Sequence, residues 1–461
     1  MIARPPDVES AVLLVDSKTR DLDVAALIAS HLRSLGIACH LEPLEAFRAV
    51  LAAYRPGMIV FNHLTASHLV AWSKRLAEVG VLSAVLPNEG IAYDADDLRF
   101  LAGKFHQDAH IDYIFAWNEP YRRAVREELP DASTSVEVIG VPRFDFYFEP
   151  WSGLLERPQA PRSGRPRVLL CTNFVTARYR DLPPEQGDRF FAPWANRIPL
   201  YANYRQAIDA HWRARTRLLD YLGALLEADR FEVVLRPHPT EDPGFYSSWI
   251  DRLPDDQRRY LRFDPVSPIS SLILDCDLEI SCETCTTALE SWIAGKPTVE
   301  LIFERDPLWY REEHARCNVE CDQPEALPDV VARELANPAQ AGKRELRRRH
   351  LEKWCASPDG RSSLKLAEVI ASALRQKRPA DWSLLTVNDR RRALKLAIYR
   401  RLGLAYHFDP LLWLKRALFG DRYANKVYTY RKSIKPRDAE AARRQFETLS
   451  GSTAVHSRRS S

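Results

Sequence analysis

The feature that most constrains the fold is a set of short apolar segments that alternate with longer segments of helical pattern. In the first 150 residues the apolar segments are Ala11–Val15, Ala38–Leu41, Met58–Phe61, Val81–Leu86, Tyr113–Ala116 and Val136–Ile139. The helical pattern is clearest in Leu22–Leu35, which Gly36 ends. Strands that are apolar throughout are buried on both faces, so this alternation is typical of a parallel sheet covered by helices. We therefore predict an α/β fold.

A second set of the same kind follows. Its predicted strands are Val168–Cys171, Phe231–Leu235, Leu278–Ile280 and Thr298–Phe303, and its predicted helices are Ile208–Ala228 and Thr287–Ala294. The intervening Trp151–Arg165 contains Pro, Gly, Ser and Arg without periodicity, which indicates a linker. A chain of 461 residues is long enough for two such domains and a tail. We predict Rossmann-like domains at residues 1–157 and 158–376, facing each other across a cleft, and a helical extension at 377–461.

The C-terminal extension is strongly basic. Residues 390–435 contain 13 Lys or Arg and 2 Asp or Glu, whereas residues 1–389 carry a net charge of −9. Aromatic and aliphatic residues lie between these charges, and the final SGSTAVHSRRSS is expected to be disordered. The pattern suits a helix on an anionic membrane surface, and equally a helix that packs across both domains with a solvated basic face. No nucleic-acid-binding motif accompanies the charge, so no nucleic acid is expected as a partner.

Nothing in the sequence indicates a membrane span or a secretion signal. No run approaches the ~18 apolar residues that a spanning helix needs, and the N-terminus lacks the apolar core of a signal peptide. We expect a cytoplasmic protein, peripheral on the inner face of the cytoplasmic membrane if the extension docks there. Eight cysteines in this length do not indicate a disulfide scaffold. Cys282-x-x-Cys285 with Cys317-x-x-x-Cys321 has zinc-like spacing, but small residues in a tight turn explain the first pair better.

One segment of the second set offers an imidazole and a guanidinium. Phe231–Leu235 runs into Arg236-Pro237-His238-Pro239, and the prolines fix the backbone so that the imidazole is held in one direction. His238 can bind a diphosphate oxygen and stabilise it as a leaving group; a structural turn histidine is the alternative. Arg236 can pair with the same phosphate or make a structural salt bridge. Asn173 ends the first strand of this domain and is expected at the same crevice.

A second segment, CTTALESWIAGKP, offers hydroxyl groups at a predicted helix start. Hydroxyl and backbone N–H groups of Thr286 and Thr287 can bind phosphate there, although simple N-capping explains them too. Glu290 lies one helical turn further, where a carboxylate can accept hydrogen bonds from ribose hydroxyls. Both segments end at the carboxyl edge of a predicted parallel sheet, where open α/β folds bind ligands. Together they predict a diphosphate pocket.

The first predicted domain offers carboxylates and cations at the corresponding sheet edge. Glu89, in Asn88-Glu89-Gly90, follows a buried strand and can act as general base for an acceptor hydroxyl. The polar loop after the first strand holds two competing bases, Asp16 and Asp21, and two cations suited to an anionic sugar, Lys18 and Arg20. A solvated charge cluster is the alternative for this loop. Arg143 closes the domain and shapes either the cleft or only the hinge.

In chain order the motifs are VDSKTRDLD, PNEG, IGVPRFD, LLCTNF, RPHPTED and CTTALESWIAGKP. Over residues 10–305 the chain resembles the bacterial surface carbohydrate biosynthesis proteins, which are relatives of GT-B-type glycosyltransferases. RPHP and the Thr-Thr/Glu element are also similar to capsule transferases of Kdo or sialic acid and to teichoic-acid polyol-phosphate transferases. The resemblance implies that His238, Thr286 and Thr287 bind the phosphate of a cytidine nucleotide and that Glu290 binds its ribose. The chain departs from the pattern at Glu283, where the family often has an Asn-Gly-rich turn.

The sequence thus predicts a GT-B-like glycosyltransferase of capsule or lipopolysaccharide biosynthesis. Its expected partners are a nucleotide-sugar donor, CMP-linked by resemblance, and a glycan or lipid-linked acceptor. No metal or other cofactor is expected, because an imidazole and a helix terminus can neutralise the leaving phosphate. The acid pairs Asp94-x-Asp96 and Asp275-x-Asp277 are interpreted as solvated. The alternatives are a CDP-alcohol polyol-phosphate transferase, a nucleotide-sugar 2-epimerase and a non-catalytic nucleotide-binding scaffold.

Overall fold

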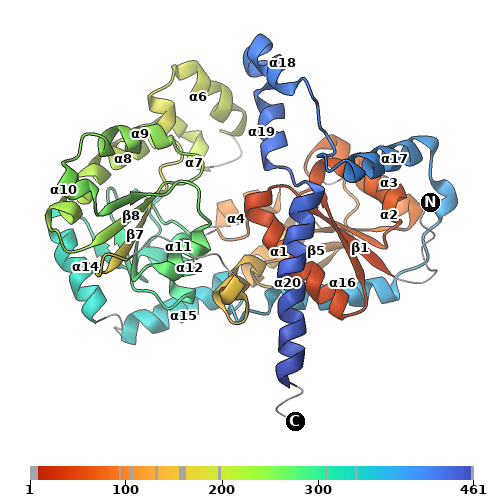
Figure 1. Cartoon of the computed structure of the whole chain (residues 1–461), viewed down its shortest axis with the longest axis horizontal. Coiled ribbons are helices and arrows are strands. Elements are labelled where there is room, and N and C mark those ends of the chain that lie inside the picture. The colour runs from red at the N-terminus through yellow and green to blue at the C-terminus, as the bar shows by residue number, and fades with distance from the viewer. Residues whose placement is uncertain are drawn as a thin grey trace. The chain divides into compact units, whose positions relative to one another are not determined.

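The computed structural model describes residues 9–92, 95–103, 108–129, 133–154, 162–195, 199–306, 309–337 and 341–457. The chain forms two compact units, each built on one six-stranded sheet (Figure 1). Unit 1 comprises Met1–Ile91, Leu101–Asp145 and Asp359–Ser461; unit 2 comprises Ala92–Phe100 and Phe146–Pro358. Every strand pair in both sheets is parallel. The predicted α/β class with two Rossmann-like domains is confirmed.

The sheet of unit 1 has the strand order β2-β1-β3-β4-β5-β6. Its strands are β1 (Ser10–Val15), β2 (Ala38–Pro43), β3 (Met58–Phe61), β4 (Leu82–Val85), β5 (Tyr113–Ala116) and β6 (Ser135–Val138). The connecting helices are α1 (Lys18–Ser34), α2 (Ala49–Tyr54), α3 (Ser67–Val79), α4 (Ala95–Ala102) and α5 (Glu119–Glu128). Every residue of β1, an inner strand of this sheet, is buried, because helices cover both of its faces. From β1 the chain adds β2 on one side and β3 onward on the other. The loops after β1 and β3 therefore diverge and leave a crevice at the carboxyl edge of the sheet, where such folds bind ligands.

The C-terminal segment packs on unit 1. It forms α16 (Ser362–Gln376), α17 (Val387–Arg401), α18 (Leu412–Phe419), α19 (Ala424–Lys432) and α20 (Pro436–Ser457). Helices α16 and α20 contact α1, and α17 contacts α2; Figure 1 shows α20 lying along α1. None of the helices in the described ranges is long and apolar enough to cross a membrane. The extension therefore packs on unit 1 through these contacts, and its docking on a membrane surface stays a prediction.

The division into units places α16 differently from the sequence prediction, which put residues 158–376 in one domain. The chain leaves unit 2 at Pro358, and α16 buries an apolar face that includes Leu366 and Ile370. The Asp145 carboxylate of unit 1 accepts hydrogen bonds from the backbone N–H groups of Ser362 and Ser363, at 3.0 and 2.7 Å. These two bonds fix the first turn of α16 on unit 1. The predicted boundary at residues 157–158 lies outside the described residues, and α20 continues through the first part of the tail predicted to be disordered.

The sheet of unit 2 has the order β12-β11-β10-β7-β8-β9. Its strands are β7 (Arg167–Cys171), β8 (Glu232–Arg236), β9 (Leu261–Phe263), β10 (Leu278–Cys282), β11 (Thr298–Leu301) and β12 (Val319–Cys321). Its helices are α6 (Pro184–Phe191), α7 (Pro199–Ala202), α8 (Tyr204–Glu227), α9 (Pro243–Ile250), α10 (Asp255–Arg258), α11 (Ile269–Asp275), α12 (Thr287–Ile293), α13 (Glu312–Ala315), α14 (Leu327–Ala336) and α15 (Ala341–Cys355). The core lies between the central strands and α8, which buries Leu218, Leu222 and Leu225.

Candidate functional site

Three neighbouring strands of unit 2 end at one sheet edge and bring their loops together. The strands are β10, β7 and β8, and their loops carry the predicted donor residues. The Asn173 side-chain amide, after β7, donates to the Glu283 carbonyl oxygen, after β10, at 3.1 Å. The backbone N–H of His238, after β8, donates to the Thr172 hydroxyl at 3.4 Å. The structure therefore brings together the HP motif, Asn173 and the turn before the threonine pair.

A buried carboxylate that sequence reasoning missed joins two of these loops. Glu241 is 6 % exposed and accepts the Thr172 hydroxyl at 2.6 Å and the Phe174 backbone N–H at 3.0 Å. It also accepts the His238 backbone N–H at 3.3 Å and the Tyr246 hydroxyl at 2.5 Å. Burial raises its pKa above the usual value, although these four donors oppose that shift. Its position three residues after the histidine in RPHPTE was the only available signal.

The His238 ring is oriented by its own turn. Its Nδ1 accepts the Thr240 backbone N–H at 3.2 Å and lies 2.9 Å from the Thr240 hydroxyl. Because Nδ1 acts as acceptor, a neutral ring carries its proton on Nε2 and presents a donor there. Arg236 is half-buried beside it, and desolvation lowers the pKa of its guanidinium. The site thus offers a fixed N–H donor and a partly desolvated cation at the end of one strand.

The threonine pair and Glu290 make contacts different from those the pattern suggested. The Thr287 hydroxyl donates at 2.8 Å to the carboxylate of Glu279, which is fully buried. Thr286 stands at the N-cap of α12, and its side chain makes no capping hydrogen bond. Glu290 is 6 % exposed and accepts the hydroxyl of Tyr147. Its position on α12 thus places Glu290 against Tyr147, and the expected contact with ribose hydroxyls stays a prediction.

The turn before α12 is conformationally unusual. Glu283 and Thr284 both have left-handed backbones, with φ of 52° and 55°. Such consecutive non-glycine residues are disfavoured, so surrounding contacts must hold the turn. The buried Glu300 carboxylate accepts the Thr284 backbone N–H at 2.8 Å, and the Thr284 hydroxyl donates to the Trp309 carbonyl oxygen at 3.1 Å. Burial, with added repulsion from Glu300 and Glu304, raises the pKa of Glu283 to about 8.

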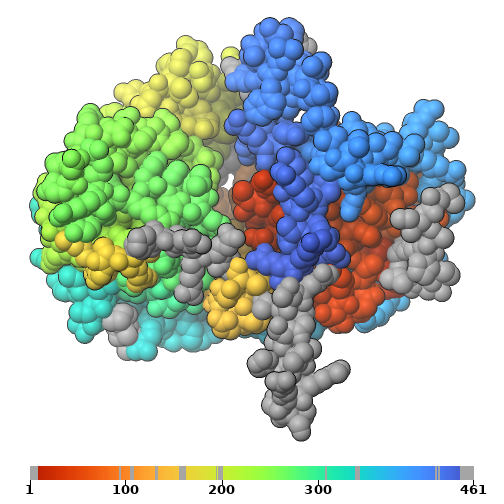
Figure 2. All heavy atoms as spheres, in the orientation of Figure 1, coloured from red at the N-terminus to blue at the C-terminus, as the bar shows by residue number. Residues whose placement is uncertain are grey.

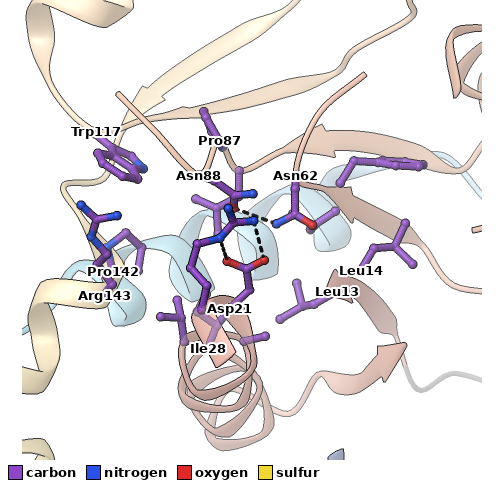
Figure 3. A pocket seen from close by; sticks show the side chains of 16 residues that line it. Leu13, Leu14, Asp21, Ile28, Asn62, Pro87, Asn88, Trp117, Pro142 and Arg143 are labelled. Atoms are coloured by element: carbon purple, nitrogen blue, oxygen red, sulfur yellow. Dashed lines mark hydrogen bonds and ion pairs between the residues drawn. The ribbon is translucent and has the colours of Figure 1, made fainter. Parts of the chain in front are cut away.

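Unit 1 contains a pocket at the carboxyl edge of its own sheet (Figure 3). The pocket encloses about 600 Å³, including the part open to solvent. Its lining residues come from the ends of β1, β3 and β4, from α1 and from the segments after β5 and β6. The walls are apolar, and the polar lining groups are Arg20, Asp21, Asn62, Asn88 and Arg143. Small polar clusters in an apolar hollow are typical of sites that fix the orientation of a ligand.

The polar groups of this pocket are paired unequally. The Arg20 guanidinium bonds Asp21 at 2.6 Å, and the Asn62 amide donates to the Asn88 side-chain oxygen at 3.1 Å (Figure 3). The Arg143 guanidinium lies over the Trp117 ring, 4.9 Å from its centroid. Its Nε is buried without a hydrogen-bond partner among the described residues. Arg143 is therefore the lining cation best placed to accept a new partner.

The predicted loop from Asp16 to Asp21 is wrong beyond Ser17, because α1 begins at Lys18. The Asp21 carboxylate accepts the Ser17 backbone N–H at 3.0 Å and so helps to start the helix. Lys18 is exposed in the first turn. Asp16 is held by Arg20 at 3.2 Å and by Lys432 of α19 at 2.5 Å.

Glu89 is exposed beside this cluster. Burial of Arg20 is outweighed by its bonds to Asp21 and by the charges of Asp21, Asp16 and Glu89, so its pKa is raised. The charges of Asp16, Asp21 and Glu89 therefore all act on Arg20, which lines the pocket. Of the carboxylates predicted as bases, Asp16 and Asp21 are engaged by cations at short distance. Glu89 is exposed in the segment after β4.

The described residues contain no group of three or more His, Cys, Asp or Glu side chains able to hold a metal ion. All eight cysteines are free thiols, and Cys282 and Cys321 belong to the apolar core of unit 2. Asp275 and Asp277 are ion-paired with Arg167 and Arg162, at the opposite end of β10 from the candidate site. Asp94, of the other acid pair, lies outside the described residues.

Comparison with known proteins shows the fold. No protein-family model and no curated protein matches the chain. A solved protein from Listeria monocytogenes, described as a UDP-N-acetylglucosamine 2-epimerase, is similar with a TM-score of 0.50 and 13% identity, over 82% of this chain and 100% of that one. A glycosyltransferase from Rickettsia africae has a TM-score of 0.45 and 9% identity, over 81% and 100% of the two chains. The glycosyltransferase SnogD from Streptomyces nogalater has a TM-score of 0.40 and 14% identity, over 79% and 100%. At 13% identity the likeness to the Listeria protein shows the fold, which is GT-B-like, and no more.

Proposed function

We propose that this protein is a nucleotide-sugar-dependent glycosyltransferase of bacterial surface polysaccharide assembly. The observation that carries the proposal is the bracing of His238, whose backbone is held by Glu241 and Thr172 and whose ring is held by Thr240. A histidine braced at a sheet edge, with a fixed N–H donor, suits the diphosphate or phosphate of a leaving nucleotide. The two Rossmann-like units supply the architecture on which such transferases are built.

In the proposed reaction the donor binds unit 2. His238 donates from Nε2 to a phosphate oxygen, Arg236 adds positive charge, and the turn at Thr286 contributes backbone N–H groups. As the bond between the anomeric carbon and the phosphate oxygen breaks, negative charge grows on that oxygen, and these groups stabilise it without a metal. The resemblance of RPHP and the threonine pair favours a cytidine nucleotide, with a Kdo- or sialic-acid-like sugar.

The acceptor, a glycan or lipid-linked glycan, occupies the pocket of unit 1. We assign Glu89, which is exposed in the segment after β4 at the carboxyl edge of the sheet, as the base that removes the acceptor hydroxyl proton. The resulting oxygen attacks the anomeric carbon while the nucleotide leaves. Arg143, with its buried Nε unpartnered and Trp117 beneath it, is proposed to bind an anionic group of the acceptor sugar. Lys18 and Arg20 add positive charge at the rim.

The donor site is tested by thermal-shift and calorimetric binding of CMP, CDP, UDP and GDP. We expect stabilisation by a cytidine nucleotide, at least a tenfold loss of affinity in His238→Ala, and no loss in His110→Ala, a partly exposed histidine of unit 1. Stabilisation by UDP or GDP would change the donor class. No binding of any nucleotide would overturn the donor assignment. Turnover is then tested with Glu89→Gln, which is expected to keep nucleotide affinity and lose transfer.

A nucleotide-sugar 2-epimerase is the second candidate, because the Listeria protein with the similar fold is described as one. An epimerase needs no acceptor. Incubation with UDP-N-acetylglucosamine alone in deuterated water distinguishes the two: deuterium at the sugar C2 would favour the epimerase, whereas an unchanged sugar supports the transferase. A polyol-phosphate transferase would instead release CMP from a CDP-alcohol and retain the phosphate in its product.

A further inference from the structure

The helices near the C-terminus expose an unusual density of large apolar side chains. Of 15 exposed large hydrophobic residues in the described part of the chain, 11 lie between Leu384 and Tyr428. They are Leu384, Val387, Leu394, Ile398, Leu402, Leu411, Trp413, Leu414, Leu418, Phe419 and Tyr428. Single exposed hydrophobics are ordinary, but their concentration in one segment marks an interaction surface.

Helix α17 packs one face against unit 1 and exposes the opposite face. Leu396 is 2 % exposed, on a helix that contacts α2. Leu394, Ile398 and Leu402 follow one another at helical spacing and are 46–64 % exposed. Arg391 lies on the same stripe and is also exposed. The fold of unit 1 therefore accounts for the buried face of α17 and leaves its apolar, basic face unexplained.

Helix α18 exposes still more apolar surface. Only Leu412 is buried, whereas Trp413, Leu414, Leu418 and Phe419 are each more than half exposed. The Arg431 guanidinium of α19 lies 5.1 Å from the centroid of the Trp413 ring. Figure 2 shows these C-terminal helices, in blue, as part of the outer surface of unit 1. A tryptophan with leucines and a phenylalanine beside cations is the composition of a segment that enters a lipid headgroup layer.

The charge of the segment decides which partner fits. Residues 390–435 carry 13 basic and 2 acidic side chains, and Arg390, Arg391, Arg401, Lys426 and Arg431 are exposed. Two copies of this surface would repel each other, whereas an anionic lipid layer attracts it and accepts its apolar side chains. We propose that the exposed faces of α17, α18 and α19 together form a docking surface for anionic phospholipid membranes.

The docking surface is joined to the pocket of unit 1. Helix α19 ends at Lys432, which bonds Asp16 at 2.5 Å, and Asp16 in turn bonds Arg20 of the pocket lining. Membrane docking thus holds the pocket near the lipid headgroups. Resting on the proposed function, this arrangement favours a lipid-linked acceptor over a free glycan. The docking itself does not depend on any reaction.

The whole 461-residue chain is tested by sedimentation with phosphatidylcholine vesicles that contain or lack phosphatidylglycerol. We expect binding that requires phosphatidylglycerol and falls in 0.5 M salt, because exposed charges are then screened. The variant Trp413→Ser/Leu414→Ser/Phe419→Ser should bind at least tenfold more weakly, and so should Arg391→Gln/Arg401→Gln. The matched control is Phe190→Ser/Val266→Ser, which removes exposed hydrophobics of unit 2 and should bind like wild type.

Melting temperatures verify that each variant is folded, which is expected because the replaced side chains are exposed. Absence of wild-type binding to anionic vesicles would overturn the proposal, as would unchanged binding by the triple variant. Concentration-dependent self-association that the triple variant abolishes, with no vesicle binding, would assign the surface to a second copy instead. Vesicle binding and nucleotide binding are separate measurements, so failure of the docking surface is distinguished from failure of the proposed transferase.

Discussion

The Glu241 carboxylate accepts the Thr172 hydroxyl at 2.6 Å, and this bond joins the loop after β8 to the loop after β7. The same oxygen receives the His238 backbone N–H, so the position of the histidine depends on a buried acid three residues away. Glu241 has no proposed role in the chemistry. It can still determine how the site binds a ligand, because it fixes the backbone that carries His238.

We expect Glu241→Gln to lose about 1–3 kcal/mol of unfolding free energy, because an amide offers one acceptor oxygen where the carboxylate receives donors on two. Nucleotide affinity should fall about tenfold, equivalent to ~1.4 kcal/mol. Urea unfolding and calorimetric titration measure the two effects. Asp242→Asn is the matched control: Asp242 caps α9 through the Gly244 backbone N–H, and Asn caps a helix equally well. Equal behaviour of the two variants would refute the bracing role of Glu241.

Glu283 provides a stability change with pH. Its folded pKa of about 8 lies above the usual 4.5, so between these values the folded state holds more protons than the unfolded state. Unfolding free energy therefore falls as pH rises through this window. Glu283→Gln removes the ionisable group and should match wild type near pH 5 and exceed it at pH 8–9, by ~5 kcal/mol at most.

The measurement is the melting temperature of both proteins from pH 5 to pH 9. Glu312→Gln is the control, because Glu312 is paired with Arg316 at the surface of unit 2 and should show no such rise. Parallel curves for Glu283→Gln and wild type would contradict the shifted pKa. If the nucleotide site is correctly placed, the variant should also bind nucleotide more tightly than wild type at pH 9, because a negative charge near the phosphate has been removed.

The two adjacent threonines should separate stability from binding. Thr287→Val removes the hydroxyl that donates a hydrogen bond to the buried Glu279 carboxylate. The other oxygen of Glu279 has no hydrogen-bond partner among the described residues. We therefore expect this variant to lose about 1–3 kcal/mol of unfolding free energy. Thr286→Val removes a hydroxyl that makes no capping bond, so its stability should stay within ~0.5 kcal/mol while nucleotide affinity falls. Thermal unfolding and titration of both variants check this. The opposite ranking would mean that the Thr287 hydroxyl, not that of Thr286, faces the ligand.

Much of the fold could be predicted from the sequence, because buried parallel strands appear there as continuous apolar segments. The ten predicted strands correspond to β1–β8, β10 and β11. The two missed strands, β9 and β12, have three residues each and are mostly half-buried, so they leave too short an apolar run. The start of α1 was placed too late because Lys18–Asp21 is polar, and a polar first turn carries no apolar periodicity.

The sequence predicted the residues of the candidate site only where neighbouring residues in the chain indicate the function. His238 stands out between two prolines, whereas Glu241 becomes significant only when Thr172, 69 positions away in the chain, packs against it. Glu290 was identified by spacing, but its burial against Tyr147 depends on a contact 143 positions away. The position of the C-terminal helices likewise depends on their contacts with α1 and α2. No pattern in the sequence of the extension indicates these contacts.

The contact between Arg400 and Glu42 tests that placement. Glu42 is 3 % exposed and accepts bonds from Arg400 of α17 and from the Tyr54 hydroxyl of α2. Arg400→Met leaves a buried carboxylate without its cation, and we expect a loss of about 1–3 kcal/mol at pH 8. Burial already raises the pKa of Glu42, so at pH 5 the carboxyl can take up a proton and the loss should be smaller. Urea unfolding at the two pH values measures this.

A second substitution gives the matched comparison. Glu42→Gln/Arg400→Met removes the charge together with its partner and should recover most of the stability that Arg400→Met loses, whereas Arg401→Met, at an exposed neighbouring position, should change it by less than ~0.5 kcal/mol. A loss in Arg400→Met no greater than that in Arg401→Met would mean that α17 does not rest on α2 in solution. Recovery in the double variant requires the two side chains to be in contact, so it identifies the C-terminal helices as a structural part of unit 1.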